Sequence, residues 1–301
     1  MNALLYAITV LIWGTTWIAI AMQTGDVPAP VSVFYRFVLA AAVLLCVLGL
    51  SGRLKRIGGR DHLFCILQGM CVFCFNFYCF YSANRYINSG LESVLFSMAI
   101  LFNAINGVIF FRQRITGKLM LANSLGIIGV VSLFWRDLNP AQMNADVLFG
   151  IGLCLLGTYG FSLGNMITAR HQRNGLDLLS TNAYAMTYGA ITMLVVIMVT
   201  GAPFRIDTSL SYLGALVYLA VFGSVVAFGT YFALVGRIGP GQAAYATVMF
   251  PLVALTISTL YEGYSWSTSA IVGLLLILSG NAVMFYKPRA RVAVAVASKP
   301  A

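Results

Sequence analysis

The residues best suited to chemistry in this sequence are cysteines, and their surroundings argue against catalysis. Cys71 and Cys74 form a Cys-x-x-Cys pair, a spacing typical of redox centres and zinc sites. The pair falls in an apolar stretch without a second pair of ligands, and His62 and His171 both fall in predicted loops. A cysteine that packs as a small apolar side chain is the interpretation we favour. We therefore expect no catalytic residue, no metal site and no cofactor, and a protein that is not an enzyme.

A second set of residues suits the binding of a small solute. Tyrosine and asparagine recur inside apolar stretches, where a polar group must find a partner or water. An aromatic ring can also hold an apolar or cationic solute through its area and its negatively charged face. The alternative is that these side chains only pack helices together. The predicted substrate-binding residues are Trp17, Tyr78, Tyr81, Asn103, Tyr159, Asn165, Tyr231 and Tyr245.

Composition predicts the elements that position these residues. Hydrophobic residues make up 60% of the chain and charged residues 9%, with a mean hydropathy of +0.90. A soluble domain carries about 25% charged residues, whereas a helix of about 20 apolar residues crosses a bilayer. We therefore predict an all-α integral membrane protein with ten transmembrane helices. They fall at residues 3–22, 30–50, 63–83, 89–111, 118–135, 147–168, 178–200, 210–235, 240–261 and 268–286.

The distribution of charge predicts the orientation of these helices. The net charge is +10, and fourteen of the 18 Lys and Arg residues fall in loops or ends on one side of the predicted membrane. Basic residues remain mainly on the cytoplasmic side of short loops. We expect a multi-pass protein of the bacterial inner membrane with both termini in the cytoplasm. The lipid bilayer then accounts for the basic charge, and we expect no nucleic acid partner.

Two parts of the chain resemble one another. They are Tyr81–Gln113 and Tyr231–Gly263, and aligning Gly90 with Gly241 also aligns Leu101 with Leu252. Five helices per copy is an odd number, so the second copy must enter the membrane inverted, as in many secondary transporters.

This repeat predicts three parts. They are a first five-helix unit at residues 1–137, a second at residues 138–288 and a cytoplasmic tail at residues 289–301. We expect a cavity lined by the first, third, fourth, sixth, eighth and ninth helices.

Three residues are expected to have structural or gating roles. Arg36 lies about 6 residues, or about 9 Å, into the second helix. It could extend to the membrane surface or pair with Glu92, the one acid inside a predicted helix. Pro251 lies inside the ninth helix, where it removes a backbone hydrogen bond and can kink the helix.

Three stretches carry a family resemblance. They read L-I-W-G-T-T-W-I-A-I, V-S-V-F-Y-R-F-V-L-A-A and Y-F-A-L-V-G-R-I-G-P-G-Q-A-A-Y-A-T-V-M-F-P-L-V-A. The chain resembles the drug/metabolite transporter superfamily, in its ten-helix exporter branch with two EamA-type repeats, over about residues 3–286. The family pattern accounts for Trp13, Arg36, Ala83, Ala233, Pro251 and Glu262.

Two residues depart from that family pattern. Ile100 replaces the proline of the fourth helix, and Gln113 stands where the family usually has glutamate. Without the proline, the first unit is expected to bend less than the second.

The resemblance implies a secondary transporter. We expect export of small amphipathic metabolites, amino acids including aromatic ones, by alternating access. The G-x-x-x-x-G-K-[ST] loop of ATPases does not occur in the sequence. The alternatives are an exporter of cationic drugs and a membrane scaffold or sensor that transports nothing. We expect a small-molecule substrate, and a monomer or weak homo-oligomer.

Overall fold

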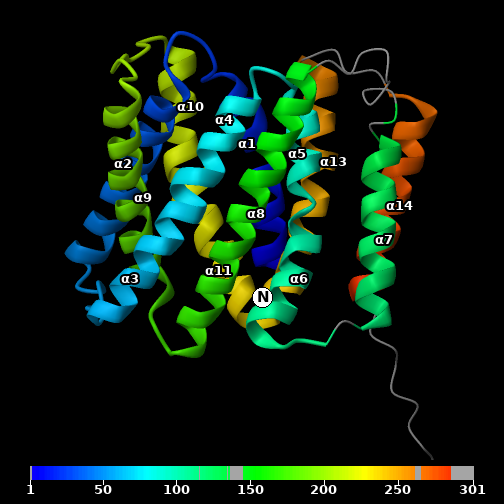
Figure 1. Ribbon diagram of the computed structural model, residues 1–301, viewed down its shortest axis with the longest axis horizontal. Coiled ribbons are helices and arrows are strands. Elements are labelled where there is room, and N and C mark those ends of the chain that lie inside the picture. The colour runs from blue at the N-terminus through cyan, green and yellow to red at the C-terminus, as the bar shows by residue number, and fades with distance from the viewer. Residues whose placement is uncertain (1, 115, 134, 136–144, 262–265, 286–301) are drawn as a thin grey trace, which may run out of the picture.

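A computed structural model describes residues 2–114, 116–133, 135, 145–261 and 266–285. These residues form a bundle of helices whose axes run roughly parallel (Figure 1). Eight helical segments are long and apolar enough to cross a membrane, and two shorter apolar helices complete the ten predicted segments. The segments are α1 (Asn2–Ala21), α2 (Ala29–Leu50), Gly59–Ala83, Ser89–Phe111, α7 (Gly117–Leu133), α8 (Ala145–Arg173), α9 (Leu178–Thr200), Leu210–Ile238, Pro240–Tyr261 and α14 (Thr268–Phe285). The predicted all-α membrane fold is confirmed.

Four of these segments are interrupted along their length. The third and the eighth segments each contain a π-helix, and the fourth and ninth each consist of two α-helices. Their parts are α3 (Gly59–Gln68), η1 (Gly69–Asn76) and α4 (Phe77–Ala83); α5 (Ser89–Phe96) and α6 (Ala99–Phe111); α10 (Leu210–Ala220), η2 (Val221–Val226) and α11 (Ala227–Ile238); and α12 (Pro240–Ala243) and α13 (Tyr245–Tyr261).

The two halves run in opposite directions. In Figure 1, α1 rises from the lower end of the bundle, whereas α8, the first helix of the second half, descends from the upper end. The basic connections after α2, α6 and α8 all lie at the lower end. The predicted boundary after residue 137, the tail at 289–301 and Glu262 lie outside the described residues.

The two π-helices occupy matching positions in the two halves. When Tyr81 is aligned with Tyr231, η1 corresponds to residues 219–226, and η2 covers most of that range. A π-helix leaves backbone groups without their usual α-helical partners and is frequent at functional sites. The same irregularity in both halves therefore directs attention to the centre of the bundle.

Local sequence explains several helix ends. The side chain of Asn88 accepts a hydrogen bond from the backbone N–H of Leu91 at 2.8 Å and so caps the start of α5. Gly201, with φ of 65°, ends α9 in the left-handed conformation that glycine adopts without strain. These local signals determine where the helical segments begin and end. The way in which the segments pack against each other depends instead on contacts between them.

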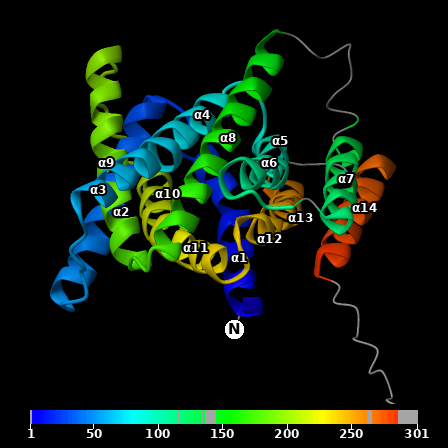
Figure 2. The ribbon, with the colours of Figure 1, turned by 60° about the horizontal axis from the view of Figure 1, so that its bottom comes forward.

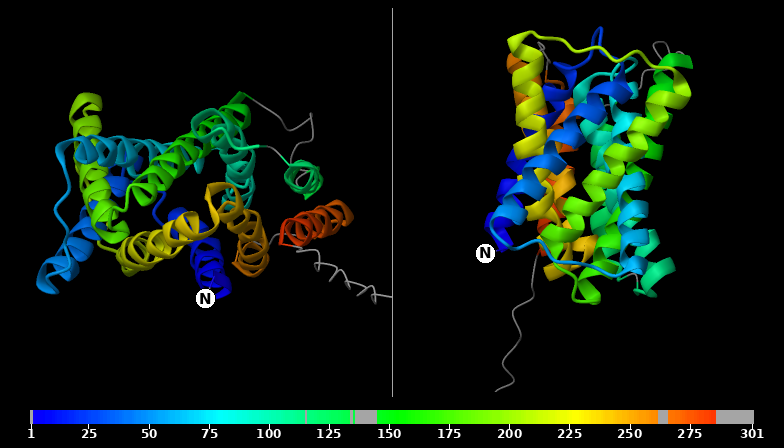
Figure 3. Two further views of the ribbon diagram at one scale, coloured as in Figure 1. Left: turned by 90° about the horizontal axis from the view of Figure 1, so that it is seen from below. Right: turned by 90° about the vertical axis from the view of Figure 1, so that its left-hand side faces the viewer.

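Glycines allow some helices to approach closely. A Cβ atom on Gly69 would lie 2.4 Å from the carbonyl oxygen of Ala185, and one on Gly189 would lie 2.6 Å from the Cβ of Phe73. Small residues allow this kind of contact between membrane helices. At the edge of the bundle, α7 and α14 lie side by side, apart from its centre (Figures 2 and 3). The remaining helices enclose the centre.

The fourth segment is interrupted although it lacks proline. α5 ends at Phe96 and α6 begins at Ala99, so Ile100 in place of the proline does not leave this segment a continuous α-helix. Ser97 lies in this break, and its hydroxyl donates to the carbonyls of Ser93 at 3.3 Å and Thr247 at 3.0 Å. Pro251 has no N–H to donate to the Thr247 carbonyl, four residues earlier. A serine of one half therefore satisfies a carbonyl that the proline of the other half leaves free.

Replacing Ser97 with alanine should destabilise the protein by about 1–3 kcal/mol, because the buried Thr247 carbonyl would lose its donor. Thermal unfolding in detergent measures the change. Ser279→Ala is the matched control, because Ser279 is exposed and donates to Leu275 in its own helix. Equal stability of the two variants would contradict the proposed role of Ser97.

Candidate substrate-binding site

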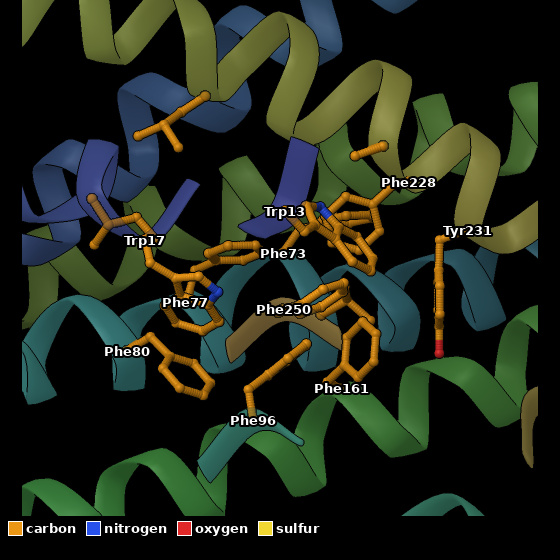
Figure 4. Close-up of a cluster of buried hydrophobic side chains, with 14 of the residues drawn as sticks. Trp13, Trp17, Phe73, Phe77, Phe80, Phe96, Phe161, Phe228, Tyr231 and Phe250 are labelled. Atoms are coloured by element: carbon orange, nitrogen blue, oxygen red, sulfur yellow. The ribbon is translucent and has the colours of Figure 1, made fainter. Parts of the chain in front are cut away.

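The centre of the bundle is an aromatic cluster around Trp13 (Figure 4). The indole ring lies 4.7 Å from Phe228, 4.9 Å from Tyr231 and 5.6 Å from Phe250, measured between ring centroids. Phe161 follows at 5.9 Å. These rings come from α11, α13 and α8, so one side chain of α1 contacts three helices of the second half. Most of the pairs meet edge to face, the arrangement that aromatic quadrupoles favour.

A small cavity lies within this cluster. Its volume is about 30 Å³, which could hold one or two water molecules but is too small for an amino acid. In this structure the helices therefore leave no room for such a solute at the site. The lining residues are the aromatic side chains of Trp13, Trp17, Phe77, Phe80, Phe96, Phe228 and Phe250, with Thr16, Ile20, Arg36 and Asn76.

The cavity lies between the two halves and near half their depth. Trp13 occupies the middle of α1, and Phe250 the middle of the Pro240–Tyr261 segment. Phe96 of the first half stacks on Phe250 of the second at 6.1 Å, with 16° between the ring planes. Secondary transporters with inverted repeats bind their substrates at this position. The second segment was not among the predicted lining helices, but its Arg36 lines the cavity. The sixth segment contributes Phe161, whose ring lies against that of the lining residue Phe96.

Arg36 points into the protein and not to the membrane surface. Its side chain is only 1% exposed. The Nε–H donates to Ser224 Oγ of η2 at 3.0 Å, and the guanidinium lies 4.3 Å from the centroid of the Phe77 ring. The proposed pair with Glu92 does not form among the described residues, because Glu92 accepts from Asn84 Nδ2 at 3.2 Å instead. The cavity therefore contains a buried positive charge.

The π-helix η2 provides the partners of this part of the site. Ser224 Oγ donates to the carbonyl of Leu219, five residues earlier, at 2.9 Å. The indole Nε1–H of Trp13 donates to the carbonyl of Gly223 at 2.9 Å. Because the π-helix widens the helical turn, its backbone can accept hydrogen bonds from the first half. The geometry of the second half thus positions both Trp13 and Arg36.

Between the cavity and the lower end of the bundle in Figure 1, three predicted residues form what we call the lower polar layer: Asn103, Asn165 and Tyr231. Asn165 Nδ2 donates to Asn103 Oδ1 at 3.3 Å and to the Tyr231 hydroxyl at 3.1 Å. Asn103 Nδ2 donates to the carbonyl of Pro240 at 3.3 Å. All three side chains are fully buried. They connect α6, α8 and α11 across the two halves, toward the end that carries the basic connections.

Above the cavity lies a second set of contacts, which we call the upper polar layer: Gln23, Thr24, Tyr81, Asn84 and Glu92. The Tyr81 hydroxyl donates to Gln23 Oε1 at 2.8 Å. Thr24 Oγ1 donates to Asn84 Oδ1 at 2.7 Å. These bonds join the end of α1 to α4 and to the turn before α5. The site thus has polar contacts between helices on both sides.

The structure places the eight predicted residues in different surroundings. Trp17 lines the cavity, and Tyr81, Asn103, Asn165 and Tyr231 belong to the polar layers. Tyr245 donates to Asn123 Oδ1 of α7 at 3.1 Å. Tyr78 is half-buried and does not line the cavity. Tyr159 is 40% exposed and packs against Phe102, so it faces away from the site.

Sequence reasoning did not find the phenylalanines of the cavity. The chain contains 20 phenylalanines, all but Phe204 in predicted apolar segments, and nothing in their spacing separates those of the centre from those facing lipid. Asn76 could have been found, because a mid-helix amide in lipid must face inward. It is 2% exposed and lines the cavity.

Ten apolar helical segments in two oppositely directed halves, with an aromatic cavity between them, define a polytopic membrane transporter. The chain belongs to the EamA-like transporter family, whose model matches residues 1–135 and 148–286. The two matches correspond to two EamA repeats and confirm the resemblance to the drug/metabolite transporter superfamily.

Relatives match most or nearly all of the length of the chain. The "Probable amino-acid metabolite efflux pump" of Escherichia coli K12 is 23% identical over 305 residues, covering 99% of each chain. Protein PagO of Salmonella typhimurium is 22% identical and covers 92% of this chain and 90% of its own. Protein PecM of Dickeya dadantii is 26% identical, with 89% and 86% coverage. A solved crystal structure matches with a TM-score of 0.75 at 15% identity, over 94% of this chain and 96% of its own, and so supports the fold.

Proposed function

We propose that this protein is a secondary transporter that exports small amphipathic metabolites, amino acids including aromatic ones, across the bacterial inner membrane by alternating access. The observation that carries the proposal is the aromatic cavity at half depth between the two halves. Amino acids fit such a site because they combine an apolar body with a polar end. The relative named as an amino-acid metabolite efflux pump points to the same substrates.

The polar layers suggest how the site alternates. The lower polar layer joins the two halves by a few hydrogen bonds, which can break and re-form as the halves rock against each other. The upper polar layer joins segments of the first half, and its hydrogen bonds can break and re-form as these segments move apart. Opening the lower polar layer would admit substrate from the side of the basic connections, and opening the upper polar layer would release it. The cavity of about 30 Å³ is too small for such a substrate, so the helices around it must move apart when substrate enters.

Two alternatives are less well supported. A cationic drug would place its charge beside the buried guanidinium of Arg36, and the described residues that line the cavity include no carboxylate. A scaffold or sensor that transports nothing gives no reason for a cavity between inverted halves. An enzyme would need reacting groups in the cavity, and its described lining offers mainly aromatic rings.

Flux through purified protein tests the proposal. The protein is reconstituted into liposomes loaded with unlabelled phenylalanine, and uptake of labelled phenylalanine is measured over a range of concentrations. We expect saturable counterflow with phenylalanine, and threonine and a cationic dye serve as comparison substrates. Protein-free liposomes are the control. Flux of the dye without flux of any amino acid would favour the drug exporter, and no saturable flux would favour the scaffold.

We further propose that both termini are cytoplasmic. Gly58 and Asn174 are exposed in the connections after α2 and α8, so Gly58→Cys and Asn174→Cys should react with an impermeant thiol reagent only in inside-out vesicles. Asp207→Cys, in the exposed connection after α9, should react only in right-side-out vesicles. Gly58 and Asn174 on opposite sides would contradict the topology.

A further inference from the structure

Three residues of the cavity carry buried polar atoms without a hydrogen-bond partner. Within the described part of the chain these atoms are Arg36 Nη1, Trp17 Nε1 and Asn76 Oδ1. Their side chains are 1%, 6% and 2% exposed, and all three line the cavity. Buried polar atoms are nearly always paired, so three unpaired atoms around one cavity call for an explanation.

The chemistry of these atoms is complementary to one kind of ligand. Arg36 and Trp17 offer N–H donors, one of them charged, whereas Asn76 offers an acceptor. A carboxylate accepts charge-assisted hydrogen bonds from a guanidinium, and these are stronger than neutral ones. An ammonium group donates to an amide oxygen. The set therefore matches a carboxylate with an ammonium group nearby.

The surroundings of Arg36 favour an anion from the substrate. Its Nε–H is bonded to Ser224, and one face lies against the Phe77 ring. Among the described residues that line the cavity, none supplies a carboxylate. A buried charge is costly unless it is paired, and a substrate carboxylate would supply the missing partner.

The aromatic rings provide the third part of the site. The indole of Trp17 turns toward the aromatic cluster (Figure 4), with Phe80 at 5.3 Å and Phe96 at 5.7 Å. These rings lie beside the polar atoms and offer apolar area on the side of Phe96 and Phe250. In an α-amino acid, one carbon carries the carboxylate, the ammonium group and the side chain. An apolar side chain on that carbon would therefore reach these aromatic rings.

We propose that the cavity is an α-amino carboxylate site, in which Arg36 Nη1 and Trp17 Nε1 bind the carboxylate, Asn76 Oδ1 accepts from the ammonium group, and the rings of Phe80, Phe96 and Phe250 surround the side chain. This inference rests on the proposed transport function and specifies the orientation of its substrate. The cavity must widen to admit the ligand, so these contacts form when the rings move apart.

Competition by substrate analogues tests the orientation in the unaltered protein. Counterflow of labelled phenylalanine is inhibited with phenylalanine, phenylalanine amide, phenethylamine and 3-phenylpropionate. The amide and the amine lack the carboxylate and should compete about 10- to 100-fold more weakly than phenylalanine. The propionate lacks only the ammonium group and should compete better than the amine. Equal inhibition by all four, or strongest inhibition by the amine, would overturn the proposal.

Variants then assign the contacts. Arg36→Gln should weaken inhibition by phenylalanine about 10- to 100-fold and leave inhibition by the amide unchanged. Trp17→Phe keeps a ring and should have a smaller effect in the same direction. Asn76→Leu should weaken inhibition by phenylalanine and leave that of the propionate unchanged. Arg205→Gln, in the exposed connection after α9, is the matched control. An equal loss for every analogue in Arg36→Gln would mean that Arg36 only supports the fold.

Binding separates this inference from the transport proposal. If the protein gives no saturable flux, stabilisation against heating by the same four compounds still measures recognition in detergent. Stabilisation by phenylalanine and the propionate, but not by the amine, would retain the carboxylate site and reject transport. Stabilisation by none of them, or by the amine alone, would reject the site as well. If Arg36→Gln does not fold, Arg36→Lys and Trp17→Phe provide the comparison.

Discussion

Replacing Trp13 with alanine should abolish saturable transport and lower the melting temperature. The indole ring contacts Phe161, Phe228 and Phe250, and its N–H is bonded to the Gly223 carbonyl of η2. Its loss would leave a hole at the interface of the two halves and an unpaired carbonyl in the membrane interior. The expected destabilisation is about 3–5 kcal/mol, as for other buried large aromatic side chains. Counterflow and thermal unfolding of the same sample measure the two effects.

Two further variants separate the ring from its hydrogen bond. Trp13→Phe keeps an aromatic ring and should retain measurable transport, with a loss of about 1–3 kcal/mol because the buried Gly223 carbonyl would lose its donor. Trp135→Ala removes an indole that is 66% exposed and should change neither property. Trp13→Ala with the transport rate of the unaltered protein would show that the cluster is not part of the substrate path.

Cross-linking the lower polar layer should stop transport. Asn103 and Asn165 belong to α6 and α8 and are joined by a hydrogen bond of 3.3 Å. Cysteines at the two positions therefore lie within reach of a short bifunctional methanethiosulfonate, which forms a reducible disulfide with each of them. A covalent link would prevent α6 and α8 from separating, and alternating access requires that separation. We expect counterflow to cease after treatment and to return after reduction of the link.

The two single variants are the controls for this experiment. Asn103→Cys alone and Asn165→Cys alone, each in a background without the six native cysteines, should keep their flux when treated with the reagent. Full flux through the cross-linked double variant would mean that the lower polar layer does not open during transport.

Hydropathy was enough to predict the segments of this fold. The fourth segment, for example, was predicted at residues 89–111 and lies at Ser89–Phe111. Lipid requires long apolar helices, so length and composition alone identify them. The break at Ser97 and the two π-helices could not be predicted, because they depend on partners in the other half. Ser97 needs the Thr247 carbonyl, and η2 needs Trp13 and Arg36.

The candidate site was predictable in part for the same reason. The rule that an amide in lipid must turn inward correctly placed Asn103 and Asn165 in the interior. The rule does not say whether an amide meets a solute or another amide, and these two meet each other. Arg36 had several possible destinations in the sequence, and only the packing of η2 decides between them. The identity of the lining phenylalanines depends on helix rotation, which the apolar sequence does not reveal.

Accessibility of the cavity from the two sides of the membrane tests the central claim most directly. Thr16 lines the cavity and is 5% exposed. A cysteine side chain is close in size and shape to threonine, so the test uses Thr16→Cys in a background without native cysteines. An impermeant thiol reagent should modify this cysteine in both right-side-out and inside-out vesicles, and phenylalanine should protect it in both. Modification from one side only, or modification that phenylalanine does not slow, would contradict a single central site with alternating access.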